Sequence, residues 1–317
     1  MSGSLVFEVR KLAPSYPRTD ETSLRAPMPV RSSESRYFAT NDGVKLHSLQ
    51  WLGAIDASAD DVGHVDDNAV DAPPIILLHG GGANAHWWDH LAPALAKDGP
   101  VFALDFRGHG DSDFPSDREV GAFNVDLEEM LNWLGREDVH LIGHSLGAAV
   151  AFDHASRHPQ TRSISLIDLA RGSTKGSGRR ARLALALRRT YLSRAEAIER
   201  FRFLPESSQP NEELRHRIAQ VSVREEPDGR FGYKFDGAWF GLPSRPRPDP
   251  REVSCPTLLI RGCESHLLSA SAGRELVEAL PRGQFIEIAG AGHHVLIDQP
   301  DELLRQIARF RGSIRHT

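Results

Sequence analysis

Short apolar runs alternate with helical segments along most of this chain, and this alternation limits the folds that it can adopt. Segments between the runs, such as 123–134, repeat apolar residues at helical spacing. Alternating strands and helices predict an α/β fold, with a mostly parallel, twisted sheet covered by helices on both faces. The runs of strand type lie at residues 74–79, 101–105, 139–143, 163–168, 257–262 and 285–290.

Three segments lie outside this pattern at the beginning of the chain. Residues 1–34 are polar, contain four prolines and lack periodicity, so we expect a loose N-terminal arm. Residues 35–52 predict two strands around an Asn-Asp-Gly turn. Residues 53–72 hold six Asp and no Lys or Arg, which indicates a solvated acidic loop.

One long insertion, residues 171–252, separates the strand at 163–168 from the strand at 257–262. Parts of it read as helices, and GLPSRPRPDP reads as a linker that returns to the sheet. We expect this insertion to form a helical cap over the strand ends. The core would then consist of residues 35–170 and 253–317.

Composition argues against nucleic acid as a partner and against a membrane span. A net charge of −5 gives no support for nucleic-acid binding. The chain lacks a stretch of 18 apolar residues, and its N-terminus lacks the apolar centre of a signal peptide. Cys255 and Cys263 flank one strand-type run and would lie roughly 26 Å apart, which predicts free thiols in a reducing compartment. We therefore expect a cytoplasmic protein without a membrane span.

The strongest chemical signal is the pentapeptide Gly143-His144-Ser145-Leu146-Gly147 between a strand and an Ala-rich helix. A G-x-S-x-G sequence in this context predicts a sharp turn that exposes Ser145 as a nucleophile. The helix that follows favours negative charge near its N-terminus. The alternative is a turn serine without a catalytic role.

A glycine-rich turn, HGGGAN, follows the strand at 74–79. Such a turn lets backbone N–H groups approach a substrate oxygen, and the second donor would come from the residue after the nucleophile. We therefore assign the oxyanion hole to Gly81 and Leu146, with Gly80 and Gly82 as near neighbours. The alternative is a turn selected for packing.

The sequences HGGGANAHWW, DFRGHGDS, GHSLGA and GAGHHVLIDQP occur in this order at strand ends. In this respect residues 35–313 resemble the α/β-hydrolase superfamily. The resemblance implies a Ser–acid–His hydrolase with a lid after the sixth strand. It also implies that His293 is the general base, while the adjacent His294 points away.

The identity of the acid stays open between two residues. In most families that resemble this one, the acid is an Asp in the loop after the strand at 257–262, but that loop offers Glu264, Ser265 and His266. Some members carry the acid at the end of the preceding strand, where this chain has Asp168. A carboxylate at that strand end would lie at the same rim as Ser145 and His293. We favour Asp168 and keep Glu264 as the alternative.

Other residues carry weaker signals. His86 and His90 have a spacing that can bind zinc, but a third ligand is not evident, so we expect no metal and no cofactor. Residues 171–190 hold seven Lys or Arg and no acid, which indicates either a solvated face or attraction of anionic substrates or surfaces. The aromatic residues Trp87, Trp88, Trp239 and Phe240 could line an acyl pocket or belong to the core.

These observations favour a serine hydrolase that cleaves a carboxylic ester of a small-molecule substrate through an acyl-enzyme. Lactone hydrolases, hydrolases of carbon–carbon bonds and cofactor-free oxygenases of the same superfamily share these residues and stay open as alternatives. A ligand sensor without activity on the same fold is a further alternative, although an intact Ser–His pair argues against it.

Overall fold

The computed structural model describes residues 33–52, 72–171, 177–187, 189–206, 211–243 and 246–314. The expected arm, apart from its last two residues, lies outside this description, as does the acidic loop apart from residue 72. The described residues belong to one compact unit. None of the described helices is both long enough and apolar enough to cross a bilayer.

One eight-stranded sheet forms the centre of this unit, in the order β1-β2-β4-β3-β5-β6-β10-β11. The hairpin of β1 and β2 is antiparallel and pairs antiparallel with β4, whereas the pairs from β4 to β11 are parallel. The strands are β1 (Glu34–Ala39), β2 (Lys45–Trp51), β3 (Ile75–Leu78), β4 (Val101–Asp105), β5 (His140–His144), β6 (Ser163–Ile167), β10 (Thr257–Gly262) and β11 (Gly283–Ile288). Every strand expected from the sequence is therefore present, within one or two residues of its expected bounds.

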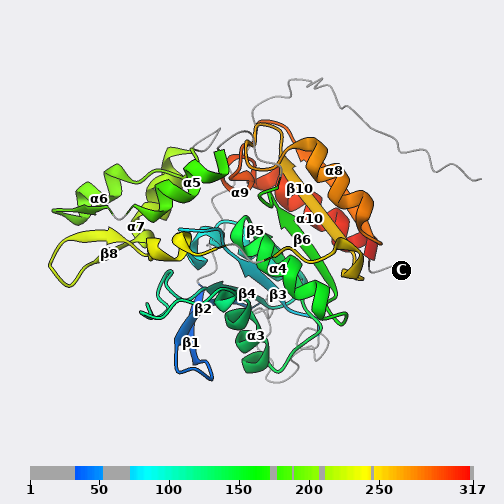
Figure 1. Ribbon diagram of the computed structural model, residues 1–317, viewed down its shortest axis with the longest axis horizontal. Coiled ribbons are helices and arrows are strands. Elements are labelled where there is room, and N and C mark those ends of the chain that lie inside the picture. The colour runs from blue at the N-terminus through cyan, green and yellow to red at the C-terminus, as the bar shows by residue number, and fades with distance from the viewer. Residues whose placement is uncertain are drawn as a thin grey trace, which may run out of the picture. The chain divides into compact units, whose positions relative to one another are not determined.

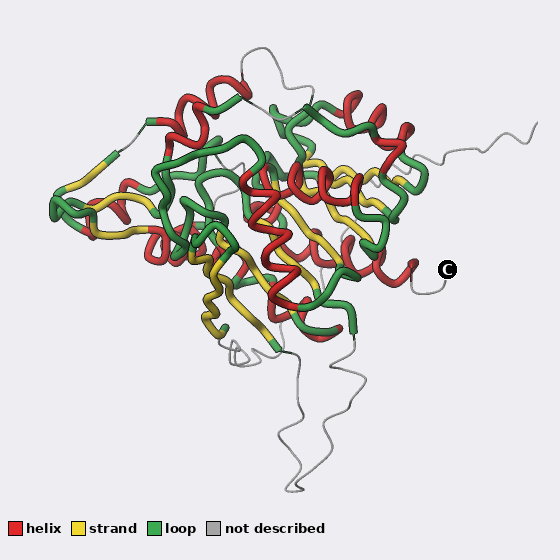
Figure 2. The backbone as a smooth tube through the Cα atoms, turned by 60° about the horizontal axis from the view of Figure 1, so that its bottom comes forward, coloured by secondary structure: helices red, strands yellow, loops and turns green. Residues whose placement is uncertain are grey.

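Side chains of the central strands alternate between two buried clusters, one on each face of the sheet. In β3, Ile75 and Leu77 belong to one cluster, and Ile76 and Leu78 belong to the other. Such apolar runs are typical of strands that are buried on both faces. Figure 2 shows the strands running between helices.

Helices cover both faces. On one face pack α3 (Ala122–Leu134), α4 (Leu146–Arg157) and α8 (Ala270–Ala279), and Figure 1 shows α3 and α4 in front of the central strands. On the other face pack the 3₁₀ helix η1 (Ala85–Trp88), α2 (Ala92–Leu95), α9 (Val295–Asp298) and α10 (Pro300–Ile314). A short 3₁₀ turn, η2 (Ala96–Asp98), leads into β4.

The region inserted between β6 and β10 contains the expected helices and one element that the sequence did not predict. Its helices are α5 (Ser177–Ala186), α6 (Arg194–Arg200) and α7 (Glu212–Ser222), followed by the 3₁₀ helices η3 (Gly237–Gly241) and η4 (Pro250–Glu252). The unexpected element is an antiparallel sheet of β7 (Thr190–Tyr191), β9 (Phe231–Tyr233) and β8 (Val223–Glu225). Its strands have two or three residues, which is too short for a recognisable alternation of side chains.

Candidate active site

Ser145 lies at a sharp turn between β5 and α4. Its φ of 50° and ψ of −105° are unusual for a residue with a side chain, and a conformation of this kind costs on the order of 1–3 kcal/mol. The two glycines of the pentapeptide are required by packing: a Cβ on Gly143 would overlap the Gly147 carbonyl, and one on Gly147 would overlap the Leu78 carbonyl. The turn therefore has the geometry that the G-x-S-x-G sequence predicts.

His293 and Asp168 lie in contact at the ends of different strands. Asp168 directly follows β6 and is fully buried, and its Oδ1 lies 2.7 Å from Nδ1 of His293. Its Oδ2 accepts a hydrogen bond from the Gly262 N–H at 3.1 Å. Asp168 and Ser145 are the two non-glycine residues with positive φ in the described part of the chain. Backbone strain of this kind is typical of functional sites.

Glu264, the alternative acid, is exposed to solvent, and its backbone N–H is bonded to the Ala291 carbonyl. The side chain in this loop that contacts the acid–histidine pair is Ser265, whose hydroxyl donates to Asp168 Oδ1 at 2.6 Å. We did not anticipate this role of Ser265 from the sequence. The available signal was a small polar residue three positions beyond β10, in the loop where the resemblance implies an acid.

The glycine-rich turn after β3 lies beside Ser145. Gly80, Gly81 and Leu146 line the same pocket as Ser145. A Cβ on Gly80 would come within 2.6 Å of the His144 ring, and one on Gly81 would come within 2.6 Å of Phe240. Leu146 is the first residue of α4, so its N–H has no partner within the helix. These backbone groups are the ones that the sequence assigned to an oxyanion hole.

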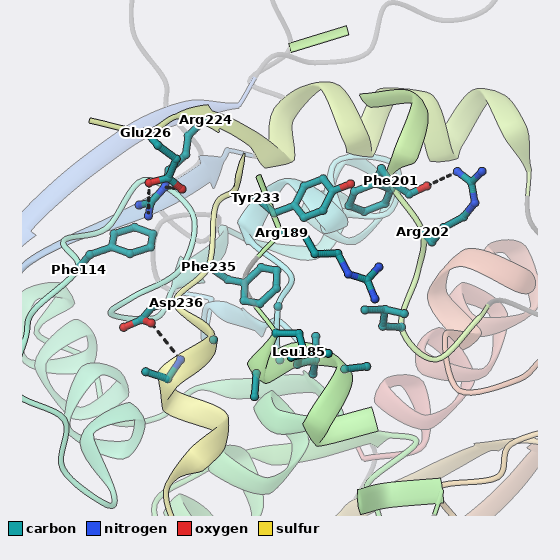
Figure 3. Close-up of a pocket in the computed structure, with 18 of the residues that line it drawn as sticks. Phe114, Leu185, Arg189, Phe201, Arg202, Arg224, Glu226, Tyr233, Phe235 and Asp236 are labelled. Carbon is teal, nitrogen blue, oxygen red and sulfur yellow. Dashed lines mark hydrogen bonds and ion pairs between the residues drawn. The ribbon is translucent and has the colours of Figure 1, made fainter. Parts of the chain in front are cut away.

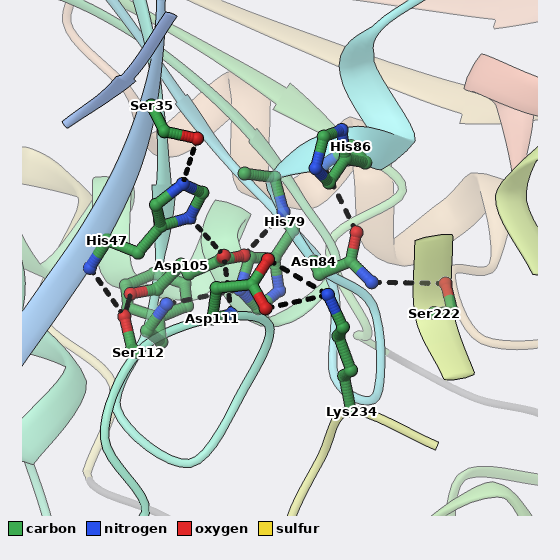
Figure 4. Close-up of polar contacts among 12 residues, drawn as sticks. Ser35, His47, His79, Asn84, His86, Asp105, Asp111, Ser112, Ser222 and Lys234 are labelled. Atoms are coloured by element: carbon green, nitrogen blue, oxygen red, sulfur yellow. Dashed lines mark hydrogen bonds and ion pairs between the residues drawn. The ribbon is translucent and has the colours of Figure 1, made fainter. Parts of the chain in front are cut away.

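A buried polar network fixes the segment that follows this turn (Figure 4). Asp105 accepts hydrogen bonds from the Ala85 N–H at 2.6 Å and from His47 Nδ1 at 2.7 Å. Asn84 donates to the Ser222 hydroxyl of α7 at 3.0 Å, and thereby ties the segment to the inserted region. Asp105, the last residue of β4, thus has a structural role here.

The pocket that contains Ser145 has a volume of about 470 Å³ and a mainly apolar lining. His293, Trp87, Trp239 and Phe240 line it, so three of the four aromatic residues singled out in the sequence contribute to this pocket. The fourth, Trp88, is fully buried in the core. Pockets of this size and character are typical of small-molecule sites.

A second pocket of about 730 Å³ adjoins the first (Figure 3). Figure 3 shows paired charges at one end, where Arg224 contacts Glu226, and the guanidinium groups of Arg189 and Arg202 at the other. The two pockets have four lining residues in common: Gly81, Trp87, Leu185 and Leu204. A long substrate would therefore have room to extend beyond the first pocket.

Two further histidines lie against His293. Burial lowers the pKa of His144 well below its ordinary value, and its Nε2 donates to the His293 carbonyl at 3.0 Å. Burial also lowers the pKa of His294 to about 3, and its Nε2 donates to the Pro205 carbonyl at 2.9 Å. Both rings are thus neutral at pH 7; His144 holds the backbone of His293, and His294 holds the backbone at Pro205 of the inserted region.

His86 and His90, whose spacing could bind zinc but for which we expected no metal, contact different partners. His86 Nδ1 contacts Asp89 at 2.9 Å, and His90 Nε2 donates to the Leu296 carbonyl at 2.7 Å. Elsewhere, two groups of described residues bring metal-ligand atoms within 4.8 Å of one another, and neither group lines the pocket of Ser145. These groups are Glu128 with His154 and His158, and His47 with Asp105 and Asp111.

Comparisons with known proteins agree with this geometry. The profile of the family described as "Alpha/beta hydrolase family" matches residues 75–306. An uncharacterized protein of Mycobacterium tuberculosis is 38% identical over 108 residues, which are 34% of this chain and 32% of that protein. The chain therefore matches about a third of the length of this relative.

Two longer matches involve a lipase and a crystal structure. The sn-1-specific diacylglycerol lipase of Mus musculus is 25% identical over 266 residues, covering 77% of this chain and 82% of the lipase. A crystal structure of an alpha/beta hydrolase from Novosphingobium aromaticivorans superposes with a TM-score of 0.71 and 25% identity, covering 88% of this chain and 97% of that one. The fold expected from the sequence, with a region inserted after the sixth strand, is confirmed.

Proposed function

The chain belongs to the alpha/beta hydrolase family, and on this premise we propose that it is a serine hydrolase that cleaves carboxylic esters of small or medium-sized, mainly apolar substrates. The observation that carries the proposal is the shared pocket. Ser145 on its strained turn and His293 both line it, and Asp168 holds the Nδ1 side of His293 at 2.7 Å.

In the proposed mechanism, Ser145 Oγ attacks the ester carbonyl carbon while His293 Nε2 accepts the hydroxyl proton. Asp168 accepts a hydrogen bond from Nδ1–H, which fixes the tautomer with a free Nε2. The N–H groups of Gly81 and Leu146 stabilise the oxyanion. His293 then donates its proton to the leaving alcohol, and water attacks the acyl-enzyme to release the acid and free Ser145.

The inserted region and the cellular location are part of the same proposal. Residues 171–252 act as a cap over the core of residues 35–170 and 253–317, because residues of this region such as Leu185, Trp239 and Phe240 line the pocket of Ser145. Cys255 and Cys263 are both free thiols, which supports the cytoplasm as the compartment.

A panel of 4-nitrophenyl esters of increasing acyl length tests the proposal. The wild-type protein should hydrolyse at least one ester, and Ser145→Ala should lower kcat by ~10⁴-fold or more while the circular dichroism spectrum is unchanged. If the variant kept more than a tenth of the wild-type activity on every ester that the wild type hydrolyses, Ser145 would not be the nucleophile.

A further inference from the structure

Two arginines line the pocket that contains Ser145, on the side where β6 leads into the inserted region. Arg171 follows Asp168 by three positions, and Arg247 lies in the segment that returns to the core. The pocket is otherwise mainly apolar. A pair of cations beside a candidate nucleophile therefore requires an explanation.

The backbone of Arg171 is held in place next to the loop that contains Ser265. Its N–H donates to the Leu267 carbonyl at 2.9 Å, and its carbonyl accepts from the Ser269 N–H at 3.2 Å. The same loop contacts Asp168 through Ser265. The position of Arg171 is thus tied to the position of the acid.

Arg171 and Arg247 line the same pocket, and the charge of one acts on the other. The pKa of Arg247 is lowered, first by loss of solvent and second by the positive charge of Arg171. Arg247 Nη2 donates to the Ala170 carbonyl at 2.6 Å, which holds the group at the pocket although the residue is exposed. Holding like charges together is unfavourable unless an anion lies between or beside them.

No acid of the described residues pairs with either guanidinium, since the ion pairs found there do not include Arg171 or Arg247. The adjoining sequence adds positive charge: residues 172–176 contain Lys175, residues 244–245 contain Arg245, and neither segment contains an acid. Neither the ion pairs of the described residues nor these two adjoining segments therefore supply an acid to the arginine pair.

The other charged residues that line this pocket have partners or lie at its rim. Arg182 donates to the carbonyls of Phe240 and Leu242. Asp153 pairs with Arg157 at 2.8 Å, and Glu119 is exposed. The arginine pair thus gives one side of the pocket a positive charge that the other lining residues do not offset.

We propose that Arg171 and Arg247 bind an anionic oxygen group of the substrate, a carboxylate or a phosphate, while the ester lies at Ser145. Planar guanidinium groups suit both anions because they donate two parallel hydrogen bonds. The inference rests on the proposed function and narrows its substrate class to esters with an apolar body and one negatively charged end.

Matched esters test this assignment. The substrates are the mono-4-nitrophenyl ester of glutaric acid, which carries a free carboxylate, and its neutral methyl ester. For the wild type we expect a higher kcat/KM with the anionic ester. Arg171→Gln and Arg247→Gln should each lower the ratio of anionic to neutral kcat/KM by about 10- to 100-fold, the range for a hydrogen bond to a charged group.

Control variants separate binding from general charge effects. Arg179→Gln removes the same charge from an exposed position of α5 that does not line the pocket, and should leave the ratio unchanged. Arg247→Lys keeps the charge but lacks the planar guanidinium group. It should therefore retain part of the wild-type preference for the anionic ester over the neutral one. A ratio within twofold of wild type in both Gln variants would overturn the inference, while Ser145-dependent hydrolysis of the neutral ester would leave the proposed function intact.

Calorimetric titration with glutarate and with inorganic phosphate measures anion binding directly, without hydrolysis of an ester. The anion that binds more tightly is the preferred one. The wild type should bind at least one of them, and Arg247→Gln should bind it at least tenfold more weakly. Absence of binding to the wild type, or equal affinity in the two proteins, would show that the arginine pair is not an anion site.

Discussion

His293 Nδ1 lies 2.7 Å from Asp168 Oδ1, although 125 residues separate them in the chain. The contact arises because the carboxyl ends of β6 and β11 lie at the same edge of the sheet. Glu264 follows β10, the strand that lies between β6 and β11, yet Glu264 is exposed to solvent. Burial and contact therefore favour Asp168 over Glu264 as the acid.

The first prediction compares these two carboxylates. Asp168→Asn should lower kcat by about 10⁴-fold, because the amide favours the wrong tautomer of His293. Glu264→Gln should retain activity within about threefold, since its side chain lies in solvent. Stopped-flow or steady-state hydrolysis of a 4-nitrophenyl ester measures both. The reverse order of effects would identify Glu264 as the acid.

Much of this site could be predicted from the sequence because the geometry of the turn and of the strand ends allows only certain residues at certain positions. Gly143 and Gly147 have no room for a side chain, so the pentapeptide specified the turn of Ser145. Asp168 and His293 follow strand-type runs, and parallel strands bring such ends together. The α/β fold followed from the same alternation of apolar runs.

The remaining features depend on contacts that a local pattern does not encode. Ser265 reaches Asp168 because the loop after β10 folds back towards β6, and its hydrogen bond was not foreseen. Trp87 lines the pocket while its neighbour Trp88 is buried in the core. Arg171 and Arg247 are 76 positions apart, and the course of the inserted region brings them together.

Ser265→Ala provides the second prediction. Loss of the hydroxyl that donates to Asp168 Oδ1 should lower kcat about tenfold with little change in KM, because the carboxylate would be less well oriented towards His293. Ser265→Thr, which keeps a hydroxyl, should recover part of the loss. If Ser265→Ala had wild-type kcat, the hydrogen bond would have no role in positioning the acid.

A third prediction concerns the turn itself. Gly147→Ala should lower the free energy of unfolding by about 3 kcal/mol, because its Cβ would overlap the Leu78 carbonyl. Gly312→Ala is the matched control: a Cβ there has no neighbour within 4 Å, and Ala favours the helix α10 by about 1 kcal/mol. Urea denaturation measures both, and equal stability of the two variants would contradict the packing argument.

The fourth prediction concerns acid stability. Burial, with the nearby charge of His158, lowers the pKa of His154 to about 3 from 6.5. Between these values the unfolded chain binds a proton that the folded protein does not, so the free energy of unfolding falls as the pH falls through this window. His154 contributes a slope of up to about 1.4 kcal/mol per pH unit.

His154→Gln should therefore flatten the dependence of the free energy of unfolding on pH between 6.5 and 3. His216→Gln, at an exposed position, is the control and should keep the wild-type slope. Denaturant titrations at several pH values provide the slopes. Identical slopes for wild type and His154→Gln would show that His154 is not held neutral by burial.

The central claim is that Ser145 is an activated nucleophile, and reaction with a fluorophosphonate followed by mass spectrometry of the tryptic peptides tests it most directly. A stoichiometric adduct should form on Ser145, should be absent in Ser145→Ala, and should form at least about 100-fold more slowly in His293→Ala. An unlabelled wild-type protein, as expected of a ligand sensor without activity, or an adduct on a different serine, would contradict the claim.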